Sequence, residues 1–206
     1  MSRVRVKICG IRDESTLRAA IEAGADAVGF VVAAPSSPRC VEIELAAELI
    51  ARTPAFVTPV VVSRHPDPET IRELFALAAP AWLQTDRSDF ASLALAPGWR
   101  PLPVLRGRVD GAALQPGWRT VLCEGADSGK GELGDWEFAA QLAANRAVVL
   151  AGGLRPDNVA TAIHRVRPYA VDVSSGVESE SAPGIKDVAA IEAFVAAVRR
   201  AESEVG

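Results

Sequence analysis

Hydrophobic and polar residues alternate along the first stretch of the chain, and the pattern then changes to a helical period. In Arg3–Ile8 every second residue is apolar, which predicts a strand with one buried face. Glu14–Ala23 follows, with Asp13 placed as an N-cap and Gly24 placed to end a helix. The opening of the chain therefore predicts one strand followed by one helix.

The same alternation of strand and helix continues along the rest of the chain. Further strands are predicted at Asp26–Val32, Phe56–Val62, Ala81–Gln84, Pro101–Leu105, Thr120–Cys123, Val148–Ala151 and Ala170–Val173. Further helices are predicted at Glu44–Arg52, Glu69–Ala78, Ser88–Leu95, Trp136–Ala144, Asp157–Val166 and Asp187–Glu202, with at most one or two helical turns at Asp110–Leu114.

This order of elements predicts an α/β fold of the (β/α)8 TIM-barrel type. No low-complexity linker divides the chain, so we expect a single domain over residues 1–206, with short or irregular helices after the fourth and fifth strands. The alternative is an open, doubly wound sheet. It is disfavoured because Cys9–Gly10–Ile11, after the first strand, lacks the G-x-G-x-x-G spacing of a dinucleotide fold.

Two glycine turns follow the last two predicted strands. Gly152–Gly153 comes after the seventh strand, with Pro156 where a helix is expected to begin, and Ser174–Gly176 comes after the eighth. Exposed backbone N–H groups at neighbouring turns, close to a helix N-terminus, form a phosphate cradle, and this is where TIM barrels place one. The alternative is two tight turns that need glycine for positive φ.

Composition excludes several classes of protein. Of the 206 residues 49% are apolar, the formal charge is −4, and no basic run is interleaved with aromatic residues, so we expect no nucleic-acid partner. The first ten residues lack the apolar core of a signal peptide, and no apolar run reaches the roughly 18 residues of a membrane span. We therefore expect a soluble, cytoplasmic protein without a membrane partner.

The cysteines and histidines give no sign of a disulfide framework or a metal centre. Cys9, Cys40 and Cys123 are odd in number and far apart. No cluster of histidines and carboxylates marks a metal site. His65 and His164 are interpreted as ordinary structural residues.

In a TIM barrel the functional groups lie at the carboxyl ends of the strands. The residues that this chain delivers there are Cys9, Ser36–Arg39, Arg64–His65, Gln84–Asp86, Arg106, Cys123–Glu124, Gly152–Gly153 and Asp172–Gly176. Cys9 is either a buried small hydrophobe or a thiol that neighbouring cations activate as a base. Arg39 is either a solvated loop cation or a clamp for a substrate carboxylate, and Asp172 either makes a structural hydrogen bond or serves the site.

At this point the residues match a known family. The chain resembles the phosphoribosylanthranilate isomerases of tryptophan biosynthesis over its whole length, densely at both ends and thinly from about Thr58 to Asp135. The matching segments are V-K-I-C-G-I-R at Val6–Arg12, G-A-D-A-V-G-F-V at Gly24–Val31, S-P-R at Ser37–Arg39, L-A-G-G-L-R-P-D-N-V at Leu150–Val159, R-P-Y-A-V-D-V-S-S-G-V-E at Arg167–Glu178 and P-G-I-K-D at Pro183–Asp187.

The resemblance implies an aldose–ketose isomerase that needs no cofactor. Its reaction is the Amadori rearrangement of N-(5-phosphoribosyl)anthranilate to 1-(2-carboxyphenylamino)-1-deoxyribulose 5-phosphate. By this resemblance Cys9 is the general base, and Arg39 holds the anthranilate carboxylate. Gly152, Gly153, Ser175 and Gly176 bind the phosphate, and Asp172 positions the substrate.

One departure from the family pattern concerns the general acid. The family ends its sixth strand with L-L-D, whose Asp is the acid, and by simple alignment Cys123 stands in that place. We expect Glu124 to replace the Asp, because a carboxylic acid is a better proton donor than a thiol. Asp127 is the fallback, and Lys7 and Arg106 are further possible site residues.

Two other interpretations remain open at this stage. A catalytically lapsed barrel would bind a sugar phosphate without turning it over, and a related isomerase would act on another aminosugar phosphate. The missing Asp at the end of the sixth strand motivates the lapsed barrel, and the ends of the third to fifth strands, which match the family poorly, permit the other isomerase. The sequence is compatible with a monomer or a homodimer.

Overall fold

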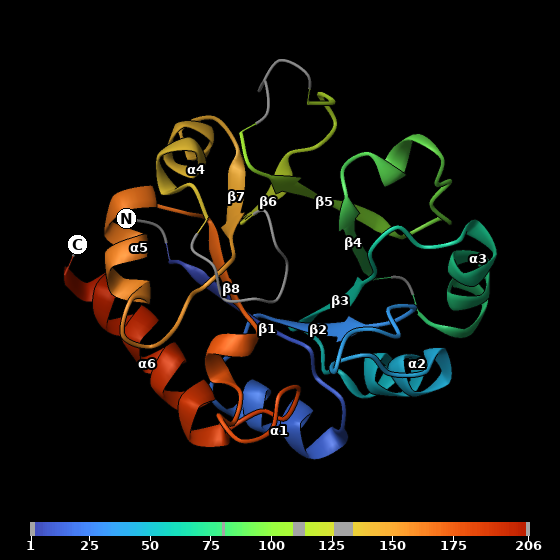
Figure 1. Ribbon diagram of the computed structural model, residues 1–206, viewed down its shortest axis with the longest axis horizontal. Helices are drawn as coiled ribbons and strands as arrows, with labels where there is room; N and C mark the ends of the chain where they lie inside the picture. Colours follow the sequence, from blue (N-terminus) through green and yellow to red (C-terminus); the bar gives the residue numbers. More distant parts are fainter. Residues whose placement is uncertain (1–2, 80, 109–113, 126–133, 205–206) are drawn as a thin grey trace.

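Eight parallel strands close into a barrel, as the sequence predicts. The computed structural model describes residues 3–79, 81–108, 114–125 and 134–204. Each strand pairs with its neighbours in sequence, and the first strand pairs with the last (Figure 1). The strands are β1 (Arg5–Cys9), β2 (Ala27–Val31), β3 (Thr58–Val62), β4 (Trp82–Asp86), β5 (Arg100–Arg106), β6 (Thr120–Glu124), β7 (Ala147–Leu150) and β8 (Ala170–Val173).

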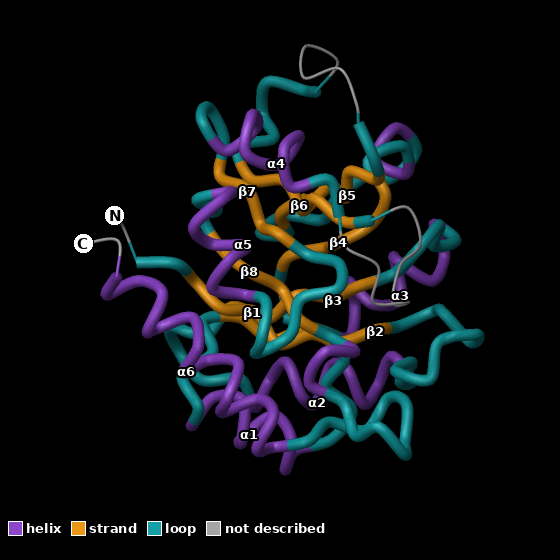
Figure 2. Tube along the Cα trace, turned by 60° about the vertical axis from the view of Figure 1, so that its left-hand side comes forward, coloured by secondary structure: helices purple, strands orange, loops and turns teal. Residues whose placement is uncertain are grey.

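Helices surround the barrel on its outer side, as Figure 2 shows. They are α1 (Glu14–Glu22), α2 (Ile43–Arg52), α3 (Pro68–Leu77), α4 (Trp136–Ala143), α5 (Val159–Val166) and α6 (Val188–Glu204), with 3-10 turns η1 (Asp89–Ala91) and η3 (Ser175–Val177). Among the described residues, no helix is long and apolar enough to cross a bilayer.

The alternation of side chains divides the hydrophobic residues into two layers. Outward-facing residues such as Val6 and Ile8 belong to the large core between strands and helices. A smaller cluster, which includes Leu122 and Val149, fills the inside of the barrel. Because β1 alternates in this way, Lys7 and Cys9 both face the interior.

Aromatic residues cover the barrel wall next to β4, which η1 follows in place of a full helix. Phe75 lies against Trp99 with ring centroids 4.6 Å apart, and Phe90 meets Trp118 edge-on at 5.9 Å. These rings supply apolar area that a helix contributes elsewhere. The prediction of short or irregular segments at this point is therefore confirmed for β4, where only η1 follows.

Two predicted helices are shorter than expected. The helix predicted at Ser88–Leu95 is only η1, because the chain bends at Ser92 and reaches the Pro97–Gly98 pair soon afterwards. α5 begins at Val159, three residues after Pro156. The preceding turn is closed by Asn158, whose side chain accepts from the Arg155 N–H at 2.8 Å and donates to the Gly153 carbonyl at 2.8 Å. The segment predicted at Asp110–Leu114 lies outside the described residues apart from its last residue.

Candidate active site

A cavity of about 700 Å³ opens at the carboxyl ends of the strands. Its walls carry a thiol, two carboxylates and three guanidinium groups. Arg64 supplies one guanidinium group from the loop after β3, and the other five groups are Cys9, Glu124, Asp172, Arg39 and Arg106. These side chains come from β1, β6, β8, the loop after β2, and β5. The barrel therefore brings together five groups that the sequence places at separate strand ends.

Cys9 lies beside a buried ion pair. Lys7 Nζ donates to Asp172 Oδ1 at 2.8 Å, and their side chains are 4% and 7% exposed. Burial raises the pKa of the Cys9 thiol, and the charge of Asp172 raises it further. Lys7 and Lys186 act in the opposite direction, and the net pKa stays above the ordinary value of a thiol.

The Lys7 ammonium group stays charged in this environment. Burial alone lowers its pKa, but Asp172 and Cys9 together raise that pKa well above its ordinary value. A fixed positive charge next to the sulfur stabilises the thiolate form. The strand thus supplies both a candidate base and its counter-ion.

Gly29 on β2 leaves the space in which Cys9 and Lys7 meet. A β-carbon at this position would lie 2.8 Å from Cys9 Sγ and 3.1 Å from Lys7 Nζ. The first distance is shorter than real β-carbon contacts, and the second is tighter than most, so the sulfur or the ammonium group would have to shift. The glycine in the G-A-D-A-V-G-F-V segment therefore serves close packing against the thiol.

Arg39 is held by a carboxylate that sequence reasoning had not assigned to the site. Glu178 accepts from Arg39 Nε at 2.6 Å and from Nη2 at 2.9 Å, which fixes the plane of the guanidinium group. Lys186 donates to the same carboxylate at 2.8 Å and to the Ser174 carbonyl at 3.0 Å. Arg39 Nη1 has no hydrogen-bond partner among the described residues.

The pKa values of Glu178 and Lys186, the two residues that surround Arg39, are shifted from their ordinary values. Burial favours the neutral form of Glu178, but hydrogen bonds from Arg39, Lys186 and the Gly184 backbone lower its pKa to about 2. Burial lowers the pKa of Lys186, and contact with Glu178 offsets part of that effect. Glu178 and Lys186 stand in segments that the sequence singles out, S-S-G-V-E and P-G-I-K-D. Only the closed barrel brings them onto Arg39.

The two glycine turns touch each other. A β-carbon at Gly176 would collide with the Leu154 carbonyl oxygen, so the turn after β8 packs directly on the loop after β7. Gly152 and Gly153 have φ values of 87° and 64°, which L-residues with side chains rarely adopt. Among the described residues, the N–H groups of these two glycines have no hydrogen-bond acceptor.

Ser175 and Gly176 line a second hollow of about 630 Å³, together with Arg155. This hollow shares Arg39 and Pro183 with the larger cavity. Neither set of lining residues includes Gly152 or Gly153. Of the two turns, the one that contains Ser175 and Gly176 therefore borders open space.

The two candidates for the acid on β6 point in opposite directions. Cys123 packs in the outer core near Phe138 under α4, and burial raises its pKa to about 12. Glu124 is the next residue, so its side chain lies on the inner side and lines the large cavity. Asp127 lies outside the described residues.

Glu124 and Asp86 share one guanidinium group. Arg106 Nε donates to Asp86 Oδ1 at 2.7 Å, and Nη1 donates to Glu124 Oε2 at 2.8 Å. His65 lies at the same rim, with Nδ1 2.9 Å from Asp89 Oδ1 and Nε2 3.4 Å from Asp86 Oδ2. His164 sits on α5, where its ring contacts the Ala201 carbonyl, away from the cavity.

Two buried polar atoms near the cavity have no hydrogen-bond partner in the described part of the chain. They are Ser63 Oγ and Gln84 Oε1, and both residues line the large cavity. Buried polar atoms normally find a partner, so these two are candidates to contact a polar ligand. The described residues contain no group of three or more His, Cys, Asp or Glu side chains arranged to hold a metal ion.

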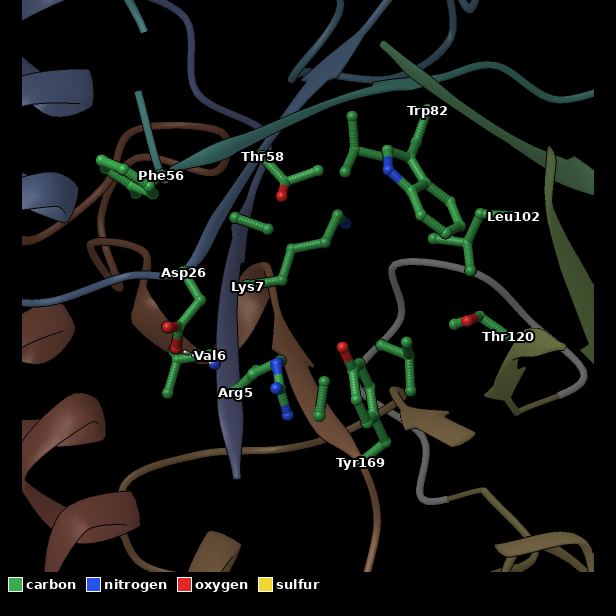
Figure 3. A pocket seen from close by; sticks show the side chains of 14 residues that line it. Arg5, Val6, Lys7, Asp26, Phe56, Thr58, Trp82, Leu102, Thr120 and Tyr169 are labelled. Atoms are coloured by element: carbon green, nitrogen blue, oxygen red, sulfur yellow. Dashed lines mark hydrogen bonds between the residues drawn. The ribbon is translucent and has the colours of Figure 1, made fainter. Parts of the chain in front are cut away.

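A smaller cavity of about 230 Å³ opens at the other end of the barrel, among the amino ends of the strands (Figure 3). Arg5 stacks on the Tyr169 ring there at 4.1 Å, and Trp82 and Leu102 supply an apolar wall. The stem of Lys7 lies along its inner side, while the ammonium group reaches Asp172. Conserved chemistry in TIM barrels lies at the opposite face, and the thiol and Glu124 both line the other cavity.

These features define a class of protein. A closed (β/α)8 barrel that gathers a thiol, carboxylates and arginines at the carboxyl ends of its strands, beside two glycine turns, has the architecture of a TIM-barrel enzyme, with a candidate site at that face.

Comparison with known proteins shows which family of TIM-barrel enzymes the chain resembles. Residues 6–197 match the family model described as N-(5'phosphoribosyl)anthranilate (PRA) isomerase. An N-(5'-phosphoribosyl)anthranilate isomerase of Pseudomonas fluorescens (strain Pf0-1) is 44% identical, over 97% of this chain and 100% of the relative. One from Haloferax volcanii is 40% identical, over 98% and 96%.

Solved structures of similar fold carry the same family name as these relatives. A phosphoribosyl anthranilate isomerase from Thermus thermophilus superposes with a TM-score of 0.76 at 31% identity, covering 96% of this chain and 99% of that one. Another isomerase, in complex with reduced 1-(o-carboxyphenylamino)-1-deoxyribulose 5-phosphate, gives 0.73 at 32% identity, covering 96% and 99%. An isomerase from Thermotoga maritima is described as dimeric. The chain belongs to the N-(5'-phosphoribosyl)anthranilate isomerase family, the intramolecular isomerases of tryptophan biosynthesis.

Proposed function

We propose that this protein catalyses the Amadori rearrangement of N-(5-phosphoribosyl)anthranilate, with Cys9 as general base and Glu124 as general acid. The observation that carries the assignment is that both side chains line one cavity, together with Arg39 and Asp172. A phosphorylated product analogue occupies a structurally similar isomerase, which supports the same class of ligand for this chain.

The reaction needs two proton transfers at neighbouring atoms. Glu124 gives a proton to the ribose ring oxygen, and the C1–O bond breaks as the anthranilate nitrogen lone pair forms a C=N bond. The Cys9 thiolate then takes the proton from C2, and those electrons form an enolamine that tautomerises to the ketose. The substrate must therefore lie between the sulfur and the carboxylate.

Both anionic ends of the substrate have a matching partner. The unoccupied Nη1 end of Arg39 suits the anthranilate carboxylate, because Glu178 already fixes the guanidinium plane. The turns at Gly152–Gly153 and Ser175–Gly176 suit the phosphate, since they offer backbone N–H groups. Asp172 holds Lys7 next to the sulfur and faces the ribose from the cavity wall.

The roles are tested by single substitutions in the purified enzyme. We expect Cys9→Ala and Glu124→Gln each to lower kcat by about 10²–10⁴-fold, the usual contribution of a general base or acid. Cys123→Ser is the matched control for the acid. It changes the neighbouring residue on the same strand, and we expect it to keep kcat within a few-fold.

The outcomes separate isomerase from binding protein. Complementation of an isomerase-deficient tryptophan auxotroph by the unaltered gene, lost in Cys9→Ala, supports the isomerase. Full kcat in Glu124→Gln would remove the proposed acid. Thermal stabilisation by a substrate analogue without any turnover in the unaltered protein would instead favour a lapsed, sugar-phosphate-binding barrel.

A further inference from the structure

The side chains of Asp86, Arg106 and Glu124 form a continuous chain of ion pairs across three neighbouring strands. Asp86 ends β4, Arg106 ends β5, and Glu124 ends β6. The side chains are only 13%, 17% and 13% exposed. Such shielding from solvent makes the pairs stronger than ordinary surface ion pairs.

The strand register explains why one arginine serves both carboxylates. Arg106 lies directly opposite Glu124 in the β5–β6 pairing, whereas Asp86 lies opposite Val104, two residues before Arg106. Arg106 Nε therefore points back along the sheet to Asp86, and Nη1 points across to Glu124 on the next strand. Because the two bonds use different nitrogens of one planar group, each bond constrains the direction of the other.

Other charged groups also face this chain of ion pairs. Arg64 Nε lies 3.7 Å from Asp86 Oδ2, and His65 Nε2 lies 3.4 Å from the same oxygen. Asp89 is engaged by His65 and by Thr85 rather than by Arg106. Among the described residues, Cys9, Arg39 and Asp172 line the same cavity as Glu124, and Asp135 lines a small pocket beside it. Lys7 is bonded to Asp172.

We propose that Asp86 is a positioning residue for the reaction, acting on Glu124 through Arg106. The proposal rests on Glu124 being the acid. The positive charge of the Arg106 guanidinium interacts with two negative charges, those of Asp86 and Glu124. Asp86 therefore offsets part of the positive charge that Arg106 places beside Glu124, the proposed proton donor. Asp86 also fixes the orientation of Arg106, and Arg106 fixes that of Glu124.

Two substitutions test this mechanism because their effects on the pH profile have opposite signs. A general acid must be protonated, so activity falls on the alkaline side of the kcat profile as the acid loses its proton. Asp86→Asn leaves the full charge of Arg106 on Glu124, so we expect the alkaline limb to move to lower pH. Arg106→Gln removes that charge, so we expect the limb to move to higher pH.

We expect a displacement of the limb of about one pH unit in each variant, which corresponds to about tenfold in kcat on that limb. KM for the aminosugar phosphate should change much less than kcat in Asp86→Asn, because Asp86 does not hold the substrate. Asp89→Asn is the matched control, since it removes a carboxylate three residues away that does not contact Arg106. We expect it to leave the limb in place.

A double substitution shows whether Asp86 acts through Glu124. If it does, Asp86→Asn adds no further loss in kcat to Glu124→Gln. Multiplicative losses, or alkaline limbs that move in the same direction in Asp86→Asn and Arg106→Gln, would overturn the proposal. If Asp86→Asn does not fold, Asp86→Glu is measured instead, and it should retain the alkaline limb of the unaltered protein.

The experiment distinguishes this proposal from the proposed function. If Glu124→Gln abolishes turnover while Asp86→Asn behaves like Asp89→Asn, the assignment of Glu124 as the acid is supported and the proposed role of Asp86 is wrong. If Glu124→Gln keeps full activity, the assignment of the acid itself is wrong.

Discussion

The ammonium group of Lys7 lies 2.8 Å from the Asp172 carboxylate inside the barrel, where both side chains are almost fully buried. The pair joins the first and last strands, whose register places the two residues opposite each other. It closes the barrel and at the same time supplies a positive charge beside Cys9. One ion pair therefore contributes to both the fold and the candidate base.

Replacing Lys7 by Met should move the acidic limb of the kcat–pH profile to higher pH. The ammonium group lowers the pKa of the Cys9 thiol, and a base must be deprotonated to act. The free energy of unfolding should fall by about 3–5 kcal/mol, because Asp172 is left buried without its cation. Denaturant unfolding and initial rates across pH measure the two effects.

The double variant Lys7→Met/Asp172→Asn separates stability from catalysis. It should recover part of the lost stability but keep a smaller displacement of the limb in the same direction, because Lys7 affects the thiol more strongly than Asp172 does. An acidic limb that stays in place in both variants would show that Lys7 does not act on the sulfur.

Gly29→Ala should lower kcat by about tenfold or more, because the added methyl group must displace the sulfur or the ammonium group and misplacing a catalytic group is costly. Gly117→Ala is the matched control, since nothing lies within 4 Å of its β-carbon position. Steady-state kinetics with circular dichroism on both variants makes the comparison. Equal kcat in the two proteins would contradict the close packing at Gly29.

Glu178→Gln should raise KM more than it lowers kcat, because Arg39 loses the carboxylate that fixes its plane. Glu178 also makes stability depend on pH. Its pKa is lowered from 4.5 to about 2, so it stabilises the fold above pH 4.5 and loses that contribution as pH falls toward 2. The shift corresponds to about 3 kcal/mol.

Unfolding measured between pH 2 and pH 6 therefore tests the same residue independently of activity. The unaltered protein should lose stability over this window more steeply than Glu178→Gln does. Parallel curves for the two proteins would show that Glu178 contributes nothing to the acid sensitivity of the fold.

Gly176→Ala should weaken the binding of phosphate and of the substrate, because its β-carbon would collide with the Leu154 carbonyl and push the two turns apart. We expect about tenfold or more in KM, since displaced N–H groups lose charge-assisted hydrogen bonds. Competitive inhibition by inorganic phosphate reports on the turn directly. An unchanged inhibition constant in a folded variant would place the phosphate elsewhere.

Local pattern predicted most of the architecture. Alternation in Arg5–Cys9 and the glycine turns after β7 and β8 are features of short segments, and they indicated a parallel barrel before any long-range contact was known. The main error concerns the bounds of the short helix expected at Ser88–Leu95, where only η1 forms and aromatic packing covers the wall.

The sequence by itself determined the order of the strands, the family, and the presence of a thiol two residues after a lysine on one strand face. It left Cys123 and Glu124 as alternatives, because β6 is buried on both faces and gives no alternation to read. Tertiary structure decided which of the two side chains faces the cavity, since the pairing of β6 with β5 and β7 fixes which face looks inward. It also decided that Glu178 holds Arg39 and that Asp172 holds Lys7, pairs 139 and 165 residues apart in the chain. The physical reason is that closure of the barrel sets these distances, and no local propensity encodes them.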